Sequence, residues 1–398
     1  MSMHIIIDAT TTQDQMAYAG AGRYTRNIIL SLVKEYPDTK YSILLFEDKE
    51  STLDTEISKY SNAEIIRIGE YKDNDYKNDL TYLTQILPAV KKIKQKDSIY
   101  FCPYFWRNFP SYSMPVVLFI HDMNLPMFNM YSQQSPLHNT IRGIQYWMTL
   151  NKSMKCKHII TNSQTTKTDI LKYYPRYPEN KVSVSYIGVE IKEKETSLEN
   201  ILPRDWKEKQ YLIYLGAGIN KSKNSKGTLL AYISFIKTLD KEKAPYFVIA
   251  GGKFEDKTKP EIKELYDIIE KNNIQDKVIF TGFYKDEDKY SLLHNAFAFI
   301  HLSLAEGFGI SPIEAMRSKT PTILHRNPVY LELFSDVSVM VDGNNAEQVG
   351  CAIKDIYNNP DKYKSLVEKA HTLSHKYTWE QSAKITHKIF ENVLDGNN

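Results

Sequence analysis

Residues 306–314 read EGFGISPIE and follow the apolar run FAFI at residues 297–300. The apolar run predicts a buried strand, the glycines predict a turn, and the residues after them predict the start of a helix. A helix N-terminus at such a junction leaves backbone N–H groups free, and these bind an anion well. Glu306 and Glu314 place one carboxylate on each side of the turn. The stretch therefore predicts a strand–turn–helix unit of an α/β fold with an anion site between two acids.

This layout suits a ligand with hydroxyl groups at both ends and an anion in the middle. A nucleotide sugar has that order of groups: sugar, diphosphate and ribose. The alternative is structural, because residues 311–314 also fit a capping box with proline at the first helical position, which would occupy Glu314. Glu306 would then be an ordinary solvated loop acid. The surrounding sequence decides between these interpretations, since a motif depends on its structural context.

Length and composition indicate a soluble globular protein. The 398 residues suffice for about two domains, and they are 42% apolar and 25% charged with a net charge of +3. No stretch approaches the roughly 18–20 apolar residues of a transmembrane helix. Residues 1–8 lack the basic start and cleavage site of a signal peptide. Three cysteines without metal-type spacing predict reduced thiols, and we expect a cytoplasmic protein: Cys102, Cys156 and Cys351.

Strand-like and helix-like segments alternate along the chain. In the C-terminal half, apolar strand candidates cover residues 211–215, 246–250, 278–281, 297–302, 322–324 and 337–341. Helical candidates lie between them near residues 227–239, 260–272, 286–295, 311–318, 328–334 and 346–358. The N-terminal half has strand candidates at residues 5–8, 42–46, 64–68, 98–101, 116–120, 158–161 and 182–186. Continuous apolar strands separated by helices predict parallel sheets covered on both faces.

Domain boundaries follow from a charged stretch between the two halves. Residues 191–200 read IKEKETSLEN and predict a linker, so we expect one domain at residues 1–192 and another at 201–377. Residues 378–381 read TWEQ, which fits a capping box at the start of a helix that runs to about Val393. Two doubly wound domains that face a cleft are the expected architecture, with ligands at the carboxyl ends of the strands.

Further motifs share their order and spacing with a known family. They read GAGRY at 20–24, IHD at 120–122, ITNS at 160–163, YLG at 214–216, FTG at 280–282 and YTW at 377–379. Together with residues 306–314, they resemble the family-4 retaining glycosyltransferases over nearly the whole chain. The pattern GIN at 218–220, ahead of Lys223 and Asn224, looks most like bacterial mannosyltransferases of polysaccharide assembly. The resemblance implies the GT-B fold, an acceptor-side first domain, a nucleotide-sugar-binding second domain and a final helix at 378–395 that packs back on the first.

The resemblance also assigns roles to individual residues. It implies catalytic roles for His121, which faces the sugar, Glu306, which binds sugar hydroxyls, and Lys223, which stabilises the departing diphosphate. The implied donor-binding residues are Gly20, Gly22, Gly216, Lys223, Lys226, Gly282, Phe308, Gly309, Ile310 and Glu314. Gly20 and Gly22 are expected in a loop, where glycine can adopt positive φ and let the backbone approach the diphosphate.

Other interpretations of these residues stay open. The family commonly has an arginine where this chain has Ser222, so we favour Lys223 first and Lys226 second as diphosphate ligands. Lone histidines such as His121 are often structural. The DND triplet at 73–75 matches a metal-binding pattern, but it lies in a polar stretch with no strand before it. We expect chemistry without a metal or another cofactor, because no His, Cys or Asp cluster has metal-site spacing.

The expected activity is that of a retaining glycosyltransferase. It would move a hexose from a nucleotide diphosphate to a hydroxyl group of a glycan or lipid-linked acceptor. GDP-mannose is the first candidate donor, with UDP-glucose, UDP-galactose and UDP-N-acetylglucosamine as alternatives. A nucleotide-sugar epimerase on the same scaffold and a non-catalytic sugar-nucleotide-binding protein are the competing functions. The second is disfavoured because the expected catalytic and ribose-binding side chains are all present.

The first half of the chain is unusually basic. Residues 91–181 contain 13 Lys or Arg against 4 Asp or Glu. Aromatic side chains are interleaved with these charges: Tyr104, Phe105, Trp106, Phe109, Tyr112, Phe128, Tyr131 and Trp147. The stretch is either a solvated basic face or the site of an acidic partner, such as an anionic membrane surface or a phosphate-bearing acceptor. No nucleic-acid-binding motif accompanies it, so we expect no nucleic acid. If the partner is an anionic membrane, the basic excess and the lack of a transmembrane stretch predict a cytoplasmic enzyme that is peripheral at the inner membrane face.

Overall fold

The computed structural model describes residues 3–13, 17, 20–70, 82–105, 114–124, 136–216, 221–252 and 254–396. The chain divides into two compact units, Met1–Gly188 with Thr378–Asn398, and Val189–Tyr377. Several predicted features lie outside the described residues: the DND triplet at 73–75, the GIN pattern at 218–220, and the aromatic residues Trp106, Phe109, Tyr112, Phe128 and Tyr131.

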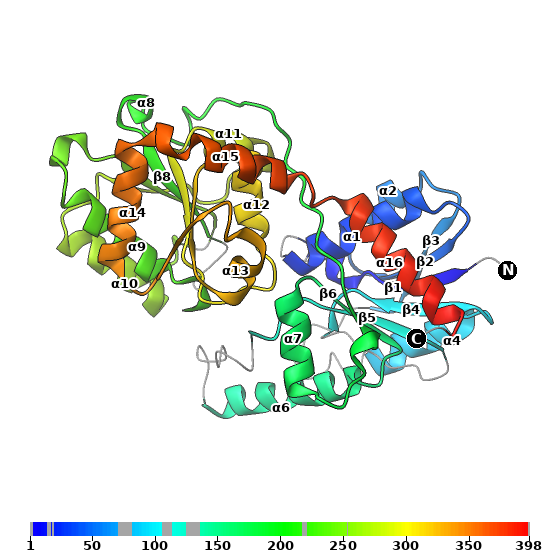
Figure 1. Ribbon diagram of the computed structural model, residues 1–398. Helices are drawn as coiled ribbons and strands as arrows, with labels where there is room; N and C mark the ends of the chain where they lie inside the picture. The colour runs from blue at the N-terminus through cyan, green and yellow to red at the C-terminus, as the bar shows by residue number, and fades with distance from the viewer. Residues whose placement is uncertain are drawn as a thin grey trace. The chain divides into compact units, whose positions relative to one another are not determined.

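The first unit is an α/β layer structure around one parallel sheet (Figure 1). Its described strands are β1 (His4–Asp8), β2 (Lys40–Phe46), β3 (Ala63–Ile68), β4 (Ser98–Cys102), β5 (Val116–Ile120), β6 (His158–Thr161) and β7 (Val182–Val184). Its described α-helices are α1 (Gly20–Glu35), α2 (Leu53–Ile57), α4 (Leu87–Ile93), α6 (Pro136–Ser153), α7 (Gln164–Tyr173) and α16 (Trp379–Leu394). The strand order is β3-β2-β1-β4-β5-β6-β7.

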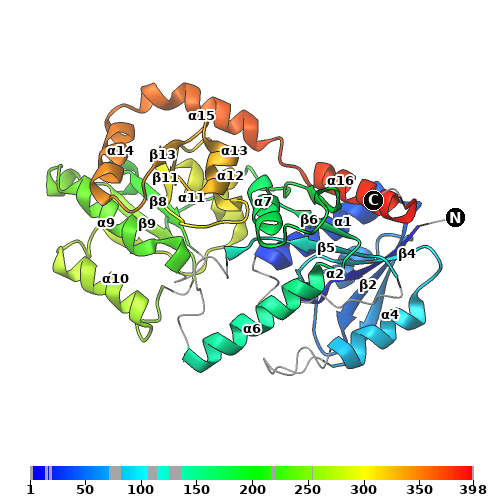
Figure 2. The ribbon, with the colours of Figure 1, turned by 60° about the horizontal axis from the view of Figure 1, so that its bottom comes forward.

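The second unit repeats this plan with a smaller sheet (Figure 2). Its described strands are β8 (Tyr211–Leu215), β9 (Tyr246–Ala250), β10 (Val278–Phe280), β11 (Ala298–His301), β12 (Thr322–His325) and β13 (Val339–Val341). Its described α-helices are α8 (Trp206–Lys209), α9 (Ser225–Ile236), α10 (Pro260–Lys271), α11 (Lys289–His294), α12 (Ile310–Arg317), α13 (Pro328–Phe334), α14 (Ala346–Asn358) and α15 (Pro360–Ser374). The strand order is β10-β9-β8-β11-β12-β13.

Both sheets are parallel, as is typical of strands that are largely apolar and buried on both faces. Every residue of β5 and of β8 is buried. The predicted α/β class with two doubly wound sheets is confirmed. In each sheet the strand order reverses direction at one point, between β1 and β4 in the first unit and between β8 and β11 in the second. Ligands of doubly wound sheets bind in the crevice outside the carboxyl ends of the strands at such a point.

Two expected helix starts differ from the structure. Gly20 and Gly22 lie in the first turn of α1, and neither has positive φ, so the prediction of a glycine loop there is wrong. Helix α12 begins at Ile310 with Gly309 as its N-cap residue. Ser311 therefore lies inside the helix, and the capping-box interpretation of residues 311–314 is also wrong.

The C-terminal helix starts where its sequence indicates. The side chain of Thr378 accepts a hydrogen bond from the backbone N–H of Gln381, which caps α16. The helix lies beside α1 in the first unit, where His387 stacks on Tyr36 with ring centroids 3.6 Å apart. No helix among the described residues is long and apolar enough to cross a membrane.

Candidate functional site

The carboxyl edge of the second sheet holds most of the predicted donor-binding residues. Lys223 lies in the loop after β8, and Glu306 lies in the loop after β11. These strands are neighbours at the point where the strand order reverses. The two loops are joined through Ser222, whose carbonyl oxygen accepts hydrogen bonds from Leu304 N at 2.6 Å and Ser303 Oγ at 3.0 Å. The topology thus brings together two predicted catalytic residues that are 83 positions apart in the sequence.

Lys223 and Glu306 form an ion pair at this point. The Lys223 Nζ lies 2.6 Å from Glu306 Oε1, and the two side chains are 29% and 14% exposed. Burial favours the neutral form of Glu306, but the positive charge of Lys223 and its hydrogen bond to the carboxylate outweigh burial and hold the pKa of the carboxyl group below its ordinary value. Glu306 is therefore ionised at neutral pH. Its carboxylate can accept hydrogen bonds from hydroxyl groups, and the neighbouring ammonium group of Lys223 can bind a phosphate.

His301 lies beside Glu306, and Tyr330 lies beside His301. His301 Nδ1 lies 2.7 Å from the hydroxyl group of Tyr330 and 3.9 Å from Glu306 Oε1, and both aromatic residues are buried. Burial lowers the pKa of His301 to about 4, so its imidazole is neutral at pH 7. Sequence reasoning did not identify either residue, although His301 ends the strand that leads into the motif.

The turn before α12 depends on one glycine. Gly309 has φ of +123°, and a Cβ at this position would lie 2.9 Å from the rings of both Phe334 and Tyr330. Phe308 is buried, and its ring contacts that of Tyr377 edge to face at 5.4 Å between centroids. The turn thus fixes the N-terminus of the eight-residue helix α12, which starts with Ile310. This helix end is the predicted anion site.

Glu314 is buried on α12 and paired with a lysine that the motif analysis did not identify. Its Oε1 lies 2.9 Å from Lys289 Nζ, and the two side chains are 5% and 8% exposed. Lys289 begins α11 and also lies 3.3 Å from Asp286 Oδ1. One Glu314 oxygen is therefore occupied by an ammonium group, which leaves the other as the candidate ribose acceptor. Only the fold could reveal this lysine, because it comes from a separate helix.

The remaining predicted donor residues surround the same sheet edge. Gly216 follows β8 and donates its N–H to Ala250 O at 3.0 Å, and Gly282 follows β10 with φ of +62°. Phe283, which follows Gly282, is 87% exposed, and its ring covers Gly252 so closely that a Cβ there would clash. Sequence reasoning overlooked this exposed aromatic ring. Lys226 instead forms an exposed ion pair, in which its Nζ lies 2.5 Å from Glu264 Oε1.

His121 belongs to the first unit, at the carboxyl end of β5. Its Nε2 lies 2.9 Å from Pro103 O, so this nitrogen carries the proton and Nδ1 is left as an acceptor. The ring packs against Tyr24 and Phe119, with centroids 5.1 and 4.7 Å away. Burial lowers the pKa of His121 to about 4, with a small opposing contribution from the hydrogen bond to Pro103. A neutral imidazole in this position suits hydrogen bonding better than attraction of an anion.

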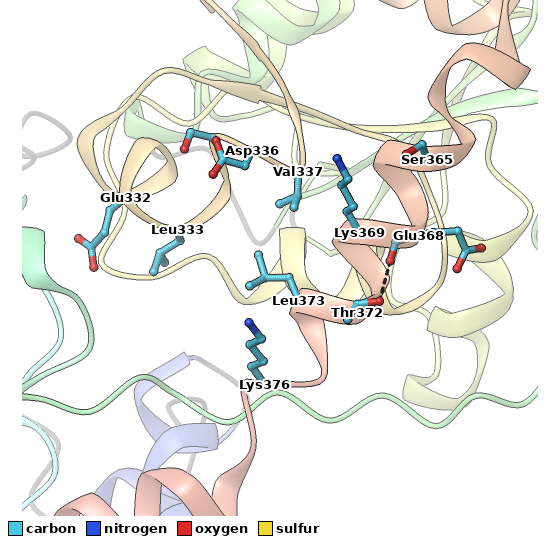
Figure 3. A pocket seen from close by; sticks show the side chains of 11 residues that line it. Glu332, Leu333, Asp336, Val337, Ser365, Glu368, Lys369, Thr372, Leu373 and Lys376 are labelled. Atoms are coloured by element: carbon cyan, nitrogen blue, oxygen red, sulfur yellow. Dashed lines mark hydrogen bonds between the residues drawn. The ribbon is translucent and has the colours of Figure 1, made fainter.

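A separate pocket lies between α13 and α15 (Figure 3). Its volume is about 540 Å³, and its wall includes Glu332, Asp336, Lys369 and Lys376. None of the predicted donor or catalytic residues lines this pocket. Neither here nor at any other place in the described part of the chain does a group of three or more His, Cys, Asp or Glu side chains have an arrangement that could hold a metal ion.

The comparisons with known proteins agree with the motif analysis. The family model described as glycosyl transferases group 1 matches residues 200–372, which lie within the second unit. Residues 200–372 are a glycosyl transferases group 1 domain. This group 1 domain contains the Lys223–Glu306 pair, the start of α12 and the Lys289–Glu314 pair. The resemblance seen in the motifs is thus confirmed for the half of the chain that carries most of the predicted site.

Two curated proteins similar to this chain are mannosyltransferases by name. The O-antigen chain mannosyltransferase RfbU of Salmonella typhimurium is 28% identical over 223 residues, which cover 56% of this chain and 57% of the relative. The serotype-specific mannosyltransferase WbdA of Escherichia coli is 22% identical over 98% of this chain and 48% of its own length. The chain thus spans about half the length of these curated relatives.

Solved structures share the fold over nearly all of the given residues. Anabaena HepE, solved in complex with UDP and glucose, has a TM-score of 0.70 at 16% identity, covering 98% of this chain and 100% of that one. Sucrose-phosphate synthase from Thermosynechococcus elongatus has a TM-score of 0.73 at 14% identity, with 99% and 100% covered. The GT-B fold predicted from the sequence is confirmed.

Proposed function

We propose that the chain is a retaining glycosyltransferase that moves mannose from GDP-mannose to a hydroxyl group of a glycan or a lipid-linked acceptor. The observation that carries this proposal is the Lys223–Glu306 pair at the point where the strand order of the group 1 domain reverses. An ammonium group and an ionised carboxylate lie side by side there, and the start of α12 lies only a few residues further along the chain. These are the groups that a sugar diphosphate requires.

In this mechanism each group acts on a different part of the donor. Lys223 and the N-terminus of α12 stabilise the negative charge that develops on the diphosphate as its bond to the sugar breaks. Glu306 accepts hydrogen bonds from sugar hydroxyl groups, and Glu314 accepts them from the ribose. The acceptor oxygen forms the new bond on the face that the diphosphate leaves, and a departing phosphate oxygen takes the acceptor proton. The products are the glycoside and the nucleoside diphosphate.

The donor assignment is supported by the relatives. RfbU and WbdA are named as mannosyltransferases, which favours mannose and favours transfer over epimerisation. We propose that positive charge from Lys223 and α12 serves in place of a metal ion, so that a chelator should leave turnover unchanged. Gly20 and Gly22 remain proposed donor-binding residues in the first turn of α1, where nothing lies within 4 Å of a Cβ at Gly20 and Gly22 is buried.

A panel of nucleotides tests the donor. GDP at about 100 times its dissociation constant should add about 2.7 kcal/mol to the free energy of unfolding, and UDP and ADP should add much less. A larger stabilisation by UDP would contradict the choice of GDP. Incubation with GDP-mannose, with and without acceptor and chelator, then tests the chemistry. Acceptor-independent conversion of the donor would indicate an epimerase, and binding without turnover would indicate a non-catalytic protein.

A further inference from the structure

The helix α6 of the first unit carries large apolar side chains on its exposed side as well as on its buried side. Tyr146 and Leu150 are buried against the sheet, as a surface helix requires. Ile144, Trp147 and Met148, however, are 56%, 36% and 54% exposed. Positions i, i+3 and i+4 share one stripe of a helix, so these three side chains form a second apolar face that points away from the core. A group of exposed apolar side chains on one helix is typical of an interaction surface.

The neighbouring helix extends this surface. The ring of Trp147 lies 5.6 Å from that of Tyr173 on α7, and Tyr173 is 38% exposed. We define the docking face as Ile144, Trp147, Met148 and Tyr173. These four are among the nine exposed large apolar side chains in the described part of the chain, and the other five are scattered over other elements. Figures 1 and 2 both show α6 at the rim of the first unit.

The charges around the docking face are almost all positive. Residues 136–181 contain eight Lys or Arg and two Asp or Glu, and no acid occurs between Asp122 and Asp169. Lys152 at the end of α6, and Lys172 and Arg176 at the end of α7, are exposed. Apolar side chains with tryptophan and tyrosine, bordered by cations, form the pattern of a surface that inserts into the boundary of an anionic bilayer.

The lysines that the sequence first suggests form a different surface. Lys91 and Lys92 lie on α4, and Lys94 and Lys96 follow it. All four are exposed, but no exposed large apolar side chain accompanies them among the described residues. Charge without an apolar face gives only weak attraction that salt screens within about 10 Å. Figure 2 shows α4 and α6 as separate parts of the first unit.

We propose that the docking face on α6 and α7 binds the first unit to an anionic membrane. Helix α6 runs antiparallel to the strands, between the end of β5 and the start of β6, so its N-terminal end lies at the sheet edge that carries His121. A lipid-linked acceptor held at the membrane would therefore present its head group near the carboxyl edge of the first sheet. Only this step, the supply of the acceptor, rests on the proposed function.

Vesicle sedimentation of the purified chain, without donor, tests the proposal. The chain should sediment with vesicles of phosphatidylcholine and phosphatidylglycerol but not with phosphatidylcholine alone, and added salt should weaken binding. Changing Lys152, Lys172 and Arg176 to Glu should weaken binding by more than about tenfold, since each nearby cation contributes roughly fivefold. The matched control changes Lys91, Lys92 and Lys94 to Glu and should retain most of the binding.

A second variant tests the apolar part. Ile144→Ser with Met148→Ser should lower binding to anionic vesicles at any salt concentration. Stabilisation by the best nucleotide of the panel, measured on each variant, shows that the fold is intact and reports separately on the proposed donor site. Equal binding to both vesicle types, no binding to either, or equal loss in the α4 control would overturn the proposal. If the chain binds neither vesicle type but retains a single protein when it is used as bait, the docking face would bind a protein partner instead of a membrane.

Discussion

At the scale of single residues, we assign to the positive charge of Lys223 the stabilisation of the departing diphosphate. Lys223→Ala should lower kcat by about 100-fold with a smaller change in KM, because its interaction strengthens in the transition state. The pKa of Glu306 should also rise once its cation is gone, so the loss of activity on the acid side should begin at higher pH. Lys226→Ala is the matched control, since Lys226 is held in an exposed pair with Glu264, and it should behave nearly as the wild type. Equal losses in both variants would refute the assignment.

Glu314 and Lys289 should respond differently to single and paired changes. Lys289→Met leaves a buried carboxylate without its cation and should cost about 3–5 kcal/mol of stability. Glu314→Gln should weaken nucleotide binding, and the double variant should recover much of the stability but not the binding. Denaturant unfolding and calorimetry with nucleotide measure the two quantities. Normal nucleotide affinity in the double variant would exclude the ribose role of Glu314.

The sequence identified Glu306 and Glu314 because both belong to one short motif with a clear strand before it. It could not identify Lys289, His301 or Tyr330 as their partners. Lys289 is 25 positions from Glu314, and Tyr330 is 29 positions from His301, so only the packing of α11 and α13 brings them together. Burial of these side chains also depends on that packing, and burial largely determines the pKa of His301.

At the scale of secondary-structure elements, the start of α12 depends on Gly309. Gly309→Ala should lower stability by about 1–3 kcal/mol, because alanine is strained at φ of +123° and its Cβ would meet Tyr330 and Phe334. Nucleotide affinity should fall as well, since the helix N-terminus would shift. Gly396→Ala provides the control, with positive φ but no atom within 4 Å of the new Cβ. Thermal unfolding with and without nucleotide measures both effects. Equal stability and equal nucleotide affinity in the two variants would contradict this account.

Strands were easier to predict than helix starts. Apolar runs such as those of β5 and β8 have few alternatives to a strand buried on both faces. Helix starts depend on one or two residues, and their signals were ambiguous here. Gly20 and Gly22 are equally compatible with a loop and with the first turn of α1, and Ser311 resembles a cap although Gly309 holds that position.

At the scale of the whole molecule, buried histidines should make the protein sensitive to acid. Burial lowers the pKa of His121 and His158 in the first unit, and of His301 in the second, to about 4. The unfolded chain, with ordinary histidines, binds more protons between about pH 6.5 and 4. The free energy of unfolding should therefore fall as pH drops through this range, by up to about 1.4 kcal/mol per pH unit for each histidine.

A single substitution measures one of these contributions. His158→Gln should flatten the decline for the first unit, because glutamine does not titrate, while the second unit keeps its dependence on pH. Denaturant unfolding at about pH 7 and about pH 5, followed with a probe in each unit, gives both slopes. An unchanged slope in the first unit would show that His158 titrates alike in the folded and unfolded chains.

The contacts of Arg317 limit where the second unit can be cut for domain exchange. It follows Glu314 on α12 by three positions and is buried, and its guanidinium group donates hydrogen bonds to Val189 O and to Ser374 O, near the two places where the second unit begins and ends. A graft cut at the family boundaries, residues 200–372, would leave both acceptors to the host chain, and a host that places these carbonyl groups differently would leave a charged group in the interior, where each lost bond costs about 1.5–3 kcal/mol. Hybrid enzymes with a new donor preference should therefore be spliced outside Val189 and Tyr377, so that the transplanted helix keeps its anchors.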